Sequence, residues 1–149
     1  MKQFAIYDVK LVRETNKRYD IETNVIDSSI QAGKIVQTVL DLNNATVEKF
    51  GMLCLDNKNK VVGVHILGIG IVNQCLVDIK GIFQRALLNN AVKIVTFHNH
   101  PAGGKESNND LDVHKKILSA CKVMEIELLD NIILQGENKY ISFAEKGLM

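Results

Sequence analysis

The sequence is poor in several features that define whole classes of proteins. Its 149 residues contain one proline, no tryptophan and only 5% aromatic residues. No apolar stretch reaches the ~18 residues that a membrane-spanning helix needs, and charges interrupt the first residues where a signal peptide has its apolar centre. The 18 basic and 17 acidic side chains leave a net charge of +1. We therefore expect neither membrane insertion nor export, and no long-range attraction to nucleic acid.

Cysteine is also scarce. Cys54, Cys75 and Cys121 are odd in number, lie far apart and form no CxxC pair. We expect them to be reduced, buried side chains in a cytoplasmic protein. The apolar fraction of 46% and the charged fraction of 23% are those of an ordinary globular chain, and the length suits one domain.

Strand-like and helix-like patterns alternate along the chain, which predicts a single α/β domain. We expect an N-terminal extension over residues 1–27, containing a strand at 4–13 and a turn or hairpin at 14–22, followed by the main domain over residues 28–149. Asp27-Ser28 offers an N-cap for the first helix of that domain. The further elements expected are a hairpin of 48–55 with 61–72, a helix over 79–88, a strand over 92–97, a helix from residue 107, and a hairpin of 126–135 with 139–143.

The most informative segment is the run that contains His98-Asn-His100. Two histidines one residue apart at the end of a strand point to the same side, with Cα atoms about 6.5 Å apart, so both imidazoles can reach one ion. Gly103-Gly104 lets the chain turn back sharply. Asp110 lies one helical turn into the next element and can complete a His₂Asp site, whose fourth position stays open for water as in catalytic zinc centres.

Such a zinc centre needs a base and a group that stabilises the oxyanion. Glu48, at the start of a predicted strand, is the candidate base, and the Ser107 hydroxyl is the candidate for the oxyanion. Simpler interpretations exist for each residue. The two histidines can bond to backbone, Ser107 and Asp110 also form a capping-box pattern, and Glu48 alone is typical of a solvated acid.

Two further histidines need an interpretation. His65 falls in a predicted hairpin, where we expect it to face solvent or to be hydrogen-bonded. His114 lies four residues after Asp110 on the same helix face, so it can substitute as a ligand, but we favour a surface histidine.

Taken together, these motifs resemble the RadC family of the JAB/MPN+ (JAMM) metallopeptidase superfamily. The resemblance runs over about residues 28–149 and rests on Glu48, His98-Asn-His-Pro-Ala-Gly, Ser107-x-x-Asp110 and the closing Tyr140-Ile-Ser-Phe-Ala-Glu-Lys-Gly-Leu. It implies a cytidine-deaminase-like, JAB1/MPN-type fold, in which a twisted mixed β-sheet is flanked by helices. By this resemblance His98, His100 and Asp110 match the zinc ligands, Glu48 the water-activating acid and Ser107 the serine of the motif. The loop from Pro101 to Glu106 is one residue shorter than the family motif.

Three hypotheses follow for function. The first is a zinc-dependent hydrolase of peptide or isopeptide bonds, because characterised members of the superfamily often cleave ubiquitin-like conjugates. The second is a non-catalytic scaffold of the same fold that acts with a DNA-repair or other protein partner, since the RadC branch carries an older DNA-repair label. Direct DNA binding is the weakest, because basic and aromatic residues are not interleaved. Nothing in the sequence selects an oligomeric state.

Overall fold

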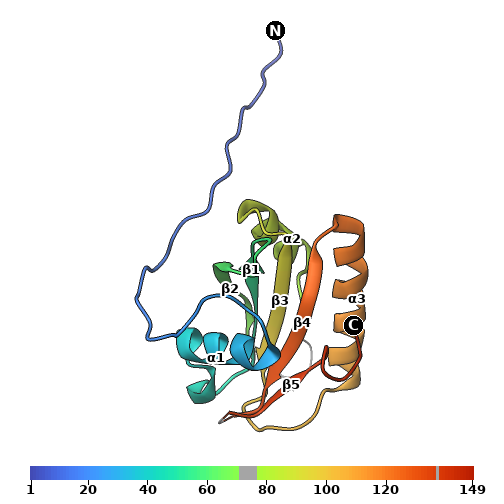
Figure 1. The fold of residues 1–149 in the computed structure, drawn as a ribbon. Coiled ribbons are helices and arrows are strands. Elements are labelled where there is room, and N and C mark those ends of the chain that lie inside the picture. The colour runs from blue at the N-terminus through green and yellow to red at the C-terminus, as the bar shows by residue number, and fades with distance from the viewer. Residues whose placement is uncertain (71–76, 137) are drawn as a thin grey trace.

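A five-stranded mixed sheet forms the centre of the structure, in the order β2-β1-β3-β4-β5 (Figure 1). The protein is described here from a computed structural model, which covers residues 1–70, 77–136 and 138–149. The elements are α1 (Ser29–Leu40), a 3₁₀ helix (Leu42–Asn44), β1 (Lys49–Leu55), β2 (Val61–Ile69), α2 (Ile79–Leu88), β3 (Lys93–Asn99), α3 (Asn108–Met124), β4 (Glu127–Leu134) and β5 (Tyr140–Ser142). Strands β3 and β4 are parallel, and the other neighbouring pairs are antiparallel. The predicted α/β domain with a mixed sheet flanked by helices is confirmed.

Side chains alternate between the two faces of the sheet, and each face has its own core. On one face Leu53 and Val95 pack with α1, whereas on the other Met52 and Ile94 pack with α2 and α3. Strands β1 and β3 are therefore covered on both sides, which explains why their sequences are almost continuously apolar.

The caps and turns that the sequence predicts begin and end the helices. The Ser28 hydroxyl accepts a hydrogen bond from the Gln31 amide at the start of α1, and Asn89 ends α2. Cys54 and Cys121 are buried free thiols, as predicted, whereas Cys75 and residues 71–72 of the second predicted strand lie outside the described residues. None of the described helices is long and apolar enough to cross a membrane.

The strand predicted over residues 4–13 is wrong, and residues 14–22 form no hairpin; of the predicted turn there is a tight one at Tyr19–Ile21, where the Ile21 amide donates to the Tyr19 carbonyl at 3.0 Å. Residues 1–20 contain no helix or strand and lead away from the sheet (Figure 1). The chain first joins the sheet at Val25, which forms an antiparallel bridge with Lys60. Alternation of apolar residues sets which way side chains point, but a strand also needs a neighbouring backbone to bond. No described strand supplies one to this segment.

Candidate metal centre

Strand β3 delivers the two histidines to one side of the sheet. Ile94, Thr96 and His98 follow one another on the face that α2 and α3 cover, and His100 continues the series just beyond the strand. His98 is 7% exposed, and its ring stacks toward Phe50 of β1 with ring centroids 6.3 Å apart. The two histidines thus lie at the end of β3, at the boundary between the buried core and the surface.

The loop after β3 turns the chain back over this end of the sheet. Gly103 and Gly104 have φ angles of 72° and 103°, a region that glycine enters without strain. The Gly103 amide donates to the His100 carbonyl at 2.9 Å, and the Gln135 side chain donates to the Gly104 carbonyl. The predicted sharp turn is confirmed, and the shorter loop still places the start of α3 beside the histidines.

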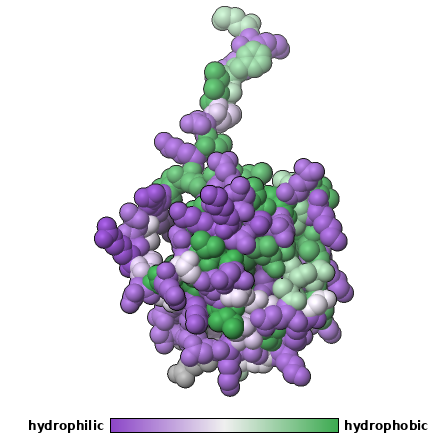
Figure 2. Space-filling model, viewed as in Figure 1, coloured by the Kyte–Doolittle hydropathy of each residue, from purple (hydrophilic) through white to green (hydrophobic). Residues whose placement is uncertain are grey.

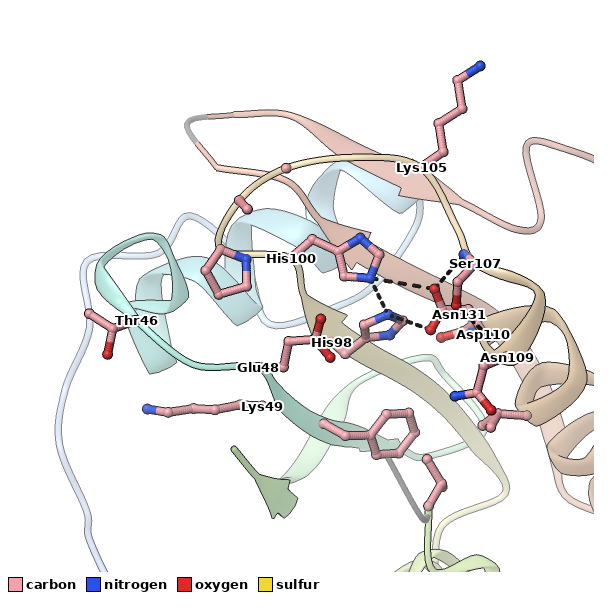
Figure 3. A pocket seen from close by; sticks show the side chains of 16 residues that line it. Thr46, Glu48, Lys49, His98, His100, Lys105, Ser107, Asn109, Asp110 and Asn131 are labelled. Atoms are coloured by element: carbon pink, nitrogen blue, oxygen red, sulfur yellow. Dashed lines mark hydrogen bonds and ion pairs between the residues drawn. The ribbon is translucent and has the colours of Figure 1, made fainter. Parts of the chain in front are cut away.

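Ser107 and Asp110 form a complete capping box at the start of α3. The Ser107 hydroxyl accepts from the Asp110 amide at 3.1 Å, and the Asp110 carboxylate accepts from the Ser107 amide at 2.7 Å. This capping explains both residues as structural groups. It also holds the Asp110 carboxylate in one orientation, toward the histidines (Figure 3).

The three predicted ligands converge on one point. His98 Nε2 lies 3.0 Å from His100 Nε2 and 3.3 Å from Asp110 Oδ1, and His100 Nε2 lies 3.5 Å from Asp110 Oδ2. Tetrahedral ligands held 2.0–2.1 Å from zinc are separated by about 3.3 Å. The distances from His98 Nε2 to His100 Nε2 and to Asp110 Oδ1 are close to this value, and one ligand atom from each of the three residues lies within 4.8 Å of the others. Two imidazole nitrogens and a carboxylate oxygen also form a donor set that zinc accepts. The residues present therefore fit the metal.

Charges within the cluster shift its pKa values. Burial acts to raise the pKa of Asp110, but hydrogen bonds with His100, with His98 and with the Ser107 amide outweigh it and hold that pKa well below its ordinary value. The hydrogen bond with Asp110 raises the pKa of His100 against the opposing effect of burial. Asp110 is thus an anion that attracts a cation into the space between the three residues.

Glu48 precedes β1 and extends from its start toward the two histidines (Figure 3). Burial raises the pKa of its carboxyl, and the nearby His100 and His98 partly oppose that effect. Its own carbonyl accepts the Gly70 amide at 2.8 Å, which ties the position to the end of β2. Glu48 is therefore a half-buried acid close to the ligand cluster, as a water-activating base needs to be.

Asn99 is a residue of this site that the sequence analysis missed. Its side chain points to the opposite face from the histidines, where its Oδ1 accepts the Lys49 amide at 2.7 Å and its Nδ2 donates to the Val47 carbonyl at 3.1 Å. These backbone groups flank Glu48, so the Asn99 amide fixes the segment that carries the acid. No local pattern distinguishes Asn99, because its partners lie 50 and 52 residues earlier in the chain.

His114 does not lie on the surface, so that expectation is wrong. It is 2% exposed, its Nε2 bonds the Leu148 carbonyl at 3.0 Å, and its ring meets Phe143 edge-on with centroids 4.6 Å apart. It is absent from the group of candidate ligands found among the described residues. The C-terminal residues cover the helix face that carries it.

His65 was expected either to face solvent or to be hydrogen-bonded. The structure shows the second, because its Nε2 lies 2.7 Å from Nδ2 of Asn89.

A pocket of about 530 Å³ opens over the cluster. Glu48, His98, His100, Ser107 and Asp110 all line it. Its wall also includes three apolar side chains: Phe50 of β1, Val113 of α3, and Val77, which precedes α2. The site thus combines a metal-binding floor with an apolar wall, an arrangement typical of small-ligand and substrate sites.

Comparison with known proteins identifies the class of this domain. The sequence profile of the RadC-like JAB domain matches residues 26–148. Similar proteins include a UPF0758 protein of Pseudomonas syringae pv. tomato, which is 33% identical over 144 residues, covering 95% of this chain and 64% of the relative. A UPF0758 protein of Thermosynechococcus vestitus is 36% identical over 125 residues, covering 83% of this chain and 49% of the relative. One of Methanosarcina barkeri is 35% identical over 103 residues, covering 68% and 44%.

The fold and the His-His-Asp group define a JAB-type domain with a candidate metal site. The chain belongs to the RadC-like JAB domain family, as its motifs suggested. It spans 44–64% of the length of the three relatives described.

Proposed function

We propose that this protein is a zinc-dependent hydrolase of peptide or isopeptide bonds. The observation that carries the proposal is that one ligand atom from each of His98, His100 and Asp110 lies within 4.8 Å of the others, in an open pocket beside Glu48. Three protein ligands leave room for water, which distinguishes catalytic zinc from structural zinc.

Zinc, when bound, supplies Lewis acidity that polarises a carbonyl group and makes water a better nucleophile at neutral pH. The chain's own residues supply the proton transfers. Glu48 takes a proton from the attacking water and returns it to the leaving nitrogen as the amide bond breaks. The raised pKa of Glu48 suits this role, because a carboxyl whose pKa lies nearer to pH 7 than that of an exposed glutamate can both accept and return a proton.

The Ser107 hydroxyl stabilises the oxyanion that develops on the scissile carbonyl by donating a hydrogen bond to it. Its hydroxyl oxygen accepts the Asp110 amide in the capping box, which leaves the hydroxyl hydrogen free to donate into the pocket. A donor held in this way by a helix start needs little reorganisation during the reaction. The cap and the catalytic role are therefore compatible.

The proposed substrate is a peptide or an isopeptide-linked protein, because the pocket is open and has an apolar wall beside the cluster. Phe50, Val77 and Val113 provide contacts for an apolar side chain next to the scissile bond. The two buried free thiols, Cys54 and Cys121, support a reducing, cytoplasmic location.

The first test is elemental analysis of the purified chain, beside His98→Ala and Glu48→Gln. We expect close to one zinc per chain in the wild type and in Glu48→Gln, and none in His98→Ala. Each protein is then incubated with a mixed peptide library and with a peptide branched through a lysine ε-amide, and the products are identified by mass spectrometry. Cleavage by the wild type alone supports the proposal.

Two results contradict it. If Glu48→Gln cleaves as fast as the wild type, Glu48 is not the base. If the wild type binds no zinc even after zinc is added back, the Ser107–Asp110 pair is only a helix cap, and the non-catalytic scaffold becomes the better explanation.

A further inference from the structure

A second pocket of about 240 Å³, called the α1 pocket below, lies between α1 and the hairpin of β4 and β5. Ile30, Gly33, Lys34 and Gln37 line its α1 side, at the three- and four-residue spacing that places side chains on one face of a helix. Leu134, at the end of β4, lines the opposite side and belongs to the core on the α1 face of the sheet. No described residue lines both this pocket and the one at the metal centre, which opens on the other face.

The α1 pocket is small and lies beside the turn of the hairpin, close to α1 (Figure 1). Its volume is below the range of about 300–1,000 Å³ that drug-sized ligands occupy, so it suits a group of about one amino-acid residue. In the same view, hydrophilic side chains make up much of the molecular surface (Figure 2). Such a surface suits a small bound group better than a broad apolar interface.

Gly33 keeps space open in the α1 pocket. A glycine inside a helix costs stability relative to alanine, because it orders a more flexible backbone. Crowding does not require the glycine here, because a Cβ atom at this position would meet only Leu134 Cδ2, at 3.9 Å. The space that a side chain at Gly33 would fill is therefore available to an apolar group of a ligand, against Leu134.

The side-chain amide of Gln37 has polar atoms without partners. Its Nε2 and Oε1 are both buried, and neither has a hydrogen-bond partner among the described residues. Buried polar groups are nearly always hydrogen-bonded, because an unmet donor or acceptor has lost its bonds to water. The amide presents a donor and an acceptor, which the C=O and N–H of a second amide group complement.

Two lysines give the α1 pocket a positive charge. Lys34 and Lys139 both line it and are exposed. Within the described ranges neither forms an ion pair, and the described lining contains no acidic residue. Two such ammonium groups favour an anion, and carboxylate oxygens accept strong, charge-assisted hydrogen bonds from them.

We propose that the α1 pocket binds an N-acylated apolar amino acid through its free α-carboxylate, the chemistry found at a peptide C-terminus. Lys34 and Lys139 hold the carboxylate. Gln37 pairs with the amide group of the acylated nitrogen, and the apolar side chain enters the space beside Gly33. This binding does not depend on the metal, because the two pockets lie on opposite faces of the sheet.

The test measures the binding of three probes to the full 149-residue chain. They are N-acetyl-leucine, N-acetyl-leucinamide and an acetylated tripeptide that ends in leucine with a free carboxylate. Isothermal titration calorimetry covers the micromolar to millimolar range, with zinc added and again after EDTA, which separates the α1 pocket from the metal centre. Shifts of backbone amide signals in NMR spectra locate each probe.

We expect N-acetyl-leucine to bind at least about tenfold more tightly than N-acetyl-leucinamide, because only the acid offers a charged acceptor to the lysines. Its affinity should be the same with zinc and with EDTA, and the signals of Gly33 and Leu134 should shift. The tripeptide distinguishes two sources of the same chemistry. Tighter binding than that of N-acetyl-leucine assigns the pocket to a peptide C-terminus, and equal or weaker binding assigns it to a free acylated amino acid.

Two variants test the groups that hold the ligand. Lys34→Gln/Lys139→Gln should bind the acid no more tightly than the amide. The matched control is Lys115→Gln/Lys116→Gln, which removes the same charge from exposed positions of α3 and should bind as the wild type does. Gln37→Leu should bind neither compound, yet its urea midpoint should equal or exceed that of the wild type, because an apolar side chain replaces two unpartnered polar atoms. A merely structural role of Gln37 would not combine lost binding with retained stability.

Each other result overturns the inference. If the acid and the amide bind equally, the lysines do not recognise a carboxylate. If inorganic phosphate competes as well as N-acetyl-leucine, the pocket recognises charge alone. If Gln37→Leu binds as the wild type does, its amide takes no part, and if no probe binds, the pocket holds only water.

Discussion

Asp110 is assigned two roles at once, ligand and helix cap, and the two are separable by thermal unfolding with and without zinc. Ser107→Ala removes the hydroxyl half of the capping box and leaves the carboxylate in place. We expect it to cost about 1 kcal/mol of stability, in line with other N-cap substitutions. Asp110→Ala removes the carboxylate half of the cap and the metal ligand together.

The two variants differ most in their response to zinc. A ligand at about 100 times its dissociation constant stabilises the folded state by about 2.7 kcal/mol. For a domain of this size that raises the melting temperature by roughly 5–11 °C. We expect the wild type and Ser107→Ala to show this shift between excess EDTA and added zinc, and Asp110→Ala to show none.

The control is Asp112→Ala, which removes an exposed carboxylate two residues further along the same helix. It should keep the full zinc-dependent shift. Circular dichroism at 222 nm follows the unfolding of all four proteins. If Asp110→Ala melts at a higher temperature with zinc by as much as the wild type, Asp110 is not a ligand and the capping box is its whole role.

Three other predictions concern residues around the centre. Asn99→Ala should lower the free energy of unfolding by about 2–4 kcal/mol, because it leaves the Lys49 amide and the Val47 carbonyl without partners; a loss below about 0.5 kcal/mol in urea titrations contradicts this role. Burial lowers the pKa of His114 below 6.5, so the unfolded chain binds this proton first as the pH falls, and the contribution of His114 should lower the stability of the EDTA-treated protein below about pH 6.5. His114→Gln should flatten that dependence in urea titrations at several pH values, and an unchanged slope refutes the assignment. Burial raises the pKa of Cys54 from 9.0 to about 12, so its thiolate should be about a thousandfold rarer than in an exposed cysteine; iodoacetamide should label Cys54 only after unfolding in urea, as peptide mass mapping reports, and equal labelling in the folded protein contradicts it.

Local patterns were enough to predict most elements of the domain. Ser28 and Ser107 cap α1 and α3 through contacts within three residues, so the information lies in the adjacent sequence. Alternation along β3 likewise places His98 and His100 on one side, whatever surrounds the strand. The candidate ligands were predicted correctly as a spatial group for the same reason, since a turn at Gly103-Gly104 connects the strand to the cap.

The failures concern contacts between distant parts of the chain. Residues 4–13 have the alternation of a strand, but pairing depends on whether another backbone lies beside them. His114 has the position of a surface residue on its helix, but Leu148, 34 residues later, covers it. Asn99 has no local distinction, yet it bonds backbone 50 and 52 residues earlier.

Sequence alone therefore determined most helices and strands of the domain, the direction of the two histidines and the residue types of the candidate metal site. Only the tertiary structure decided which side chains are buried and which strands have neighbours. It also decided how Asn99 supports Glu48 and that one ligand atom from each of the three candidate ligands lies within 4.8 Å of the others. The physical reason is that capping and alternation depend on bonds within a few residues, whereas burial and strand pairing depend on segments that folding brings together from far apart in the chain.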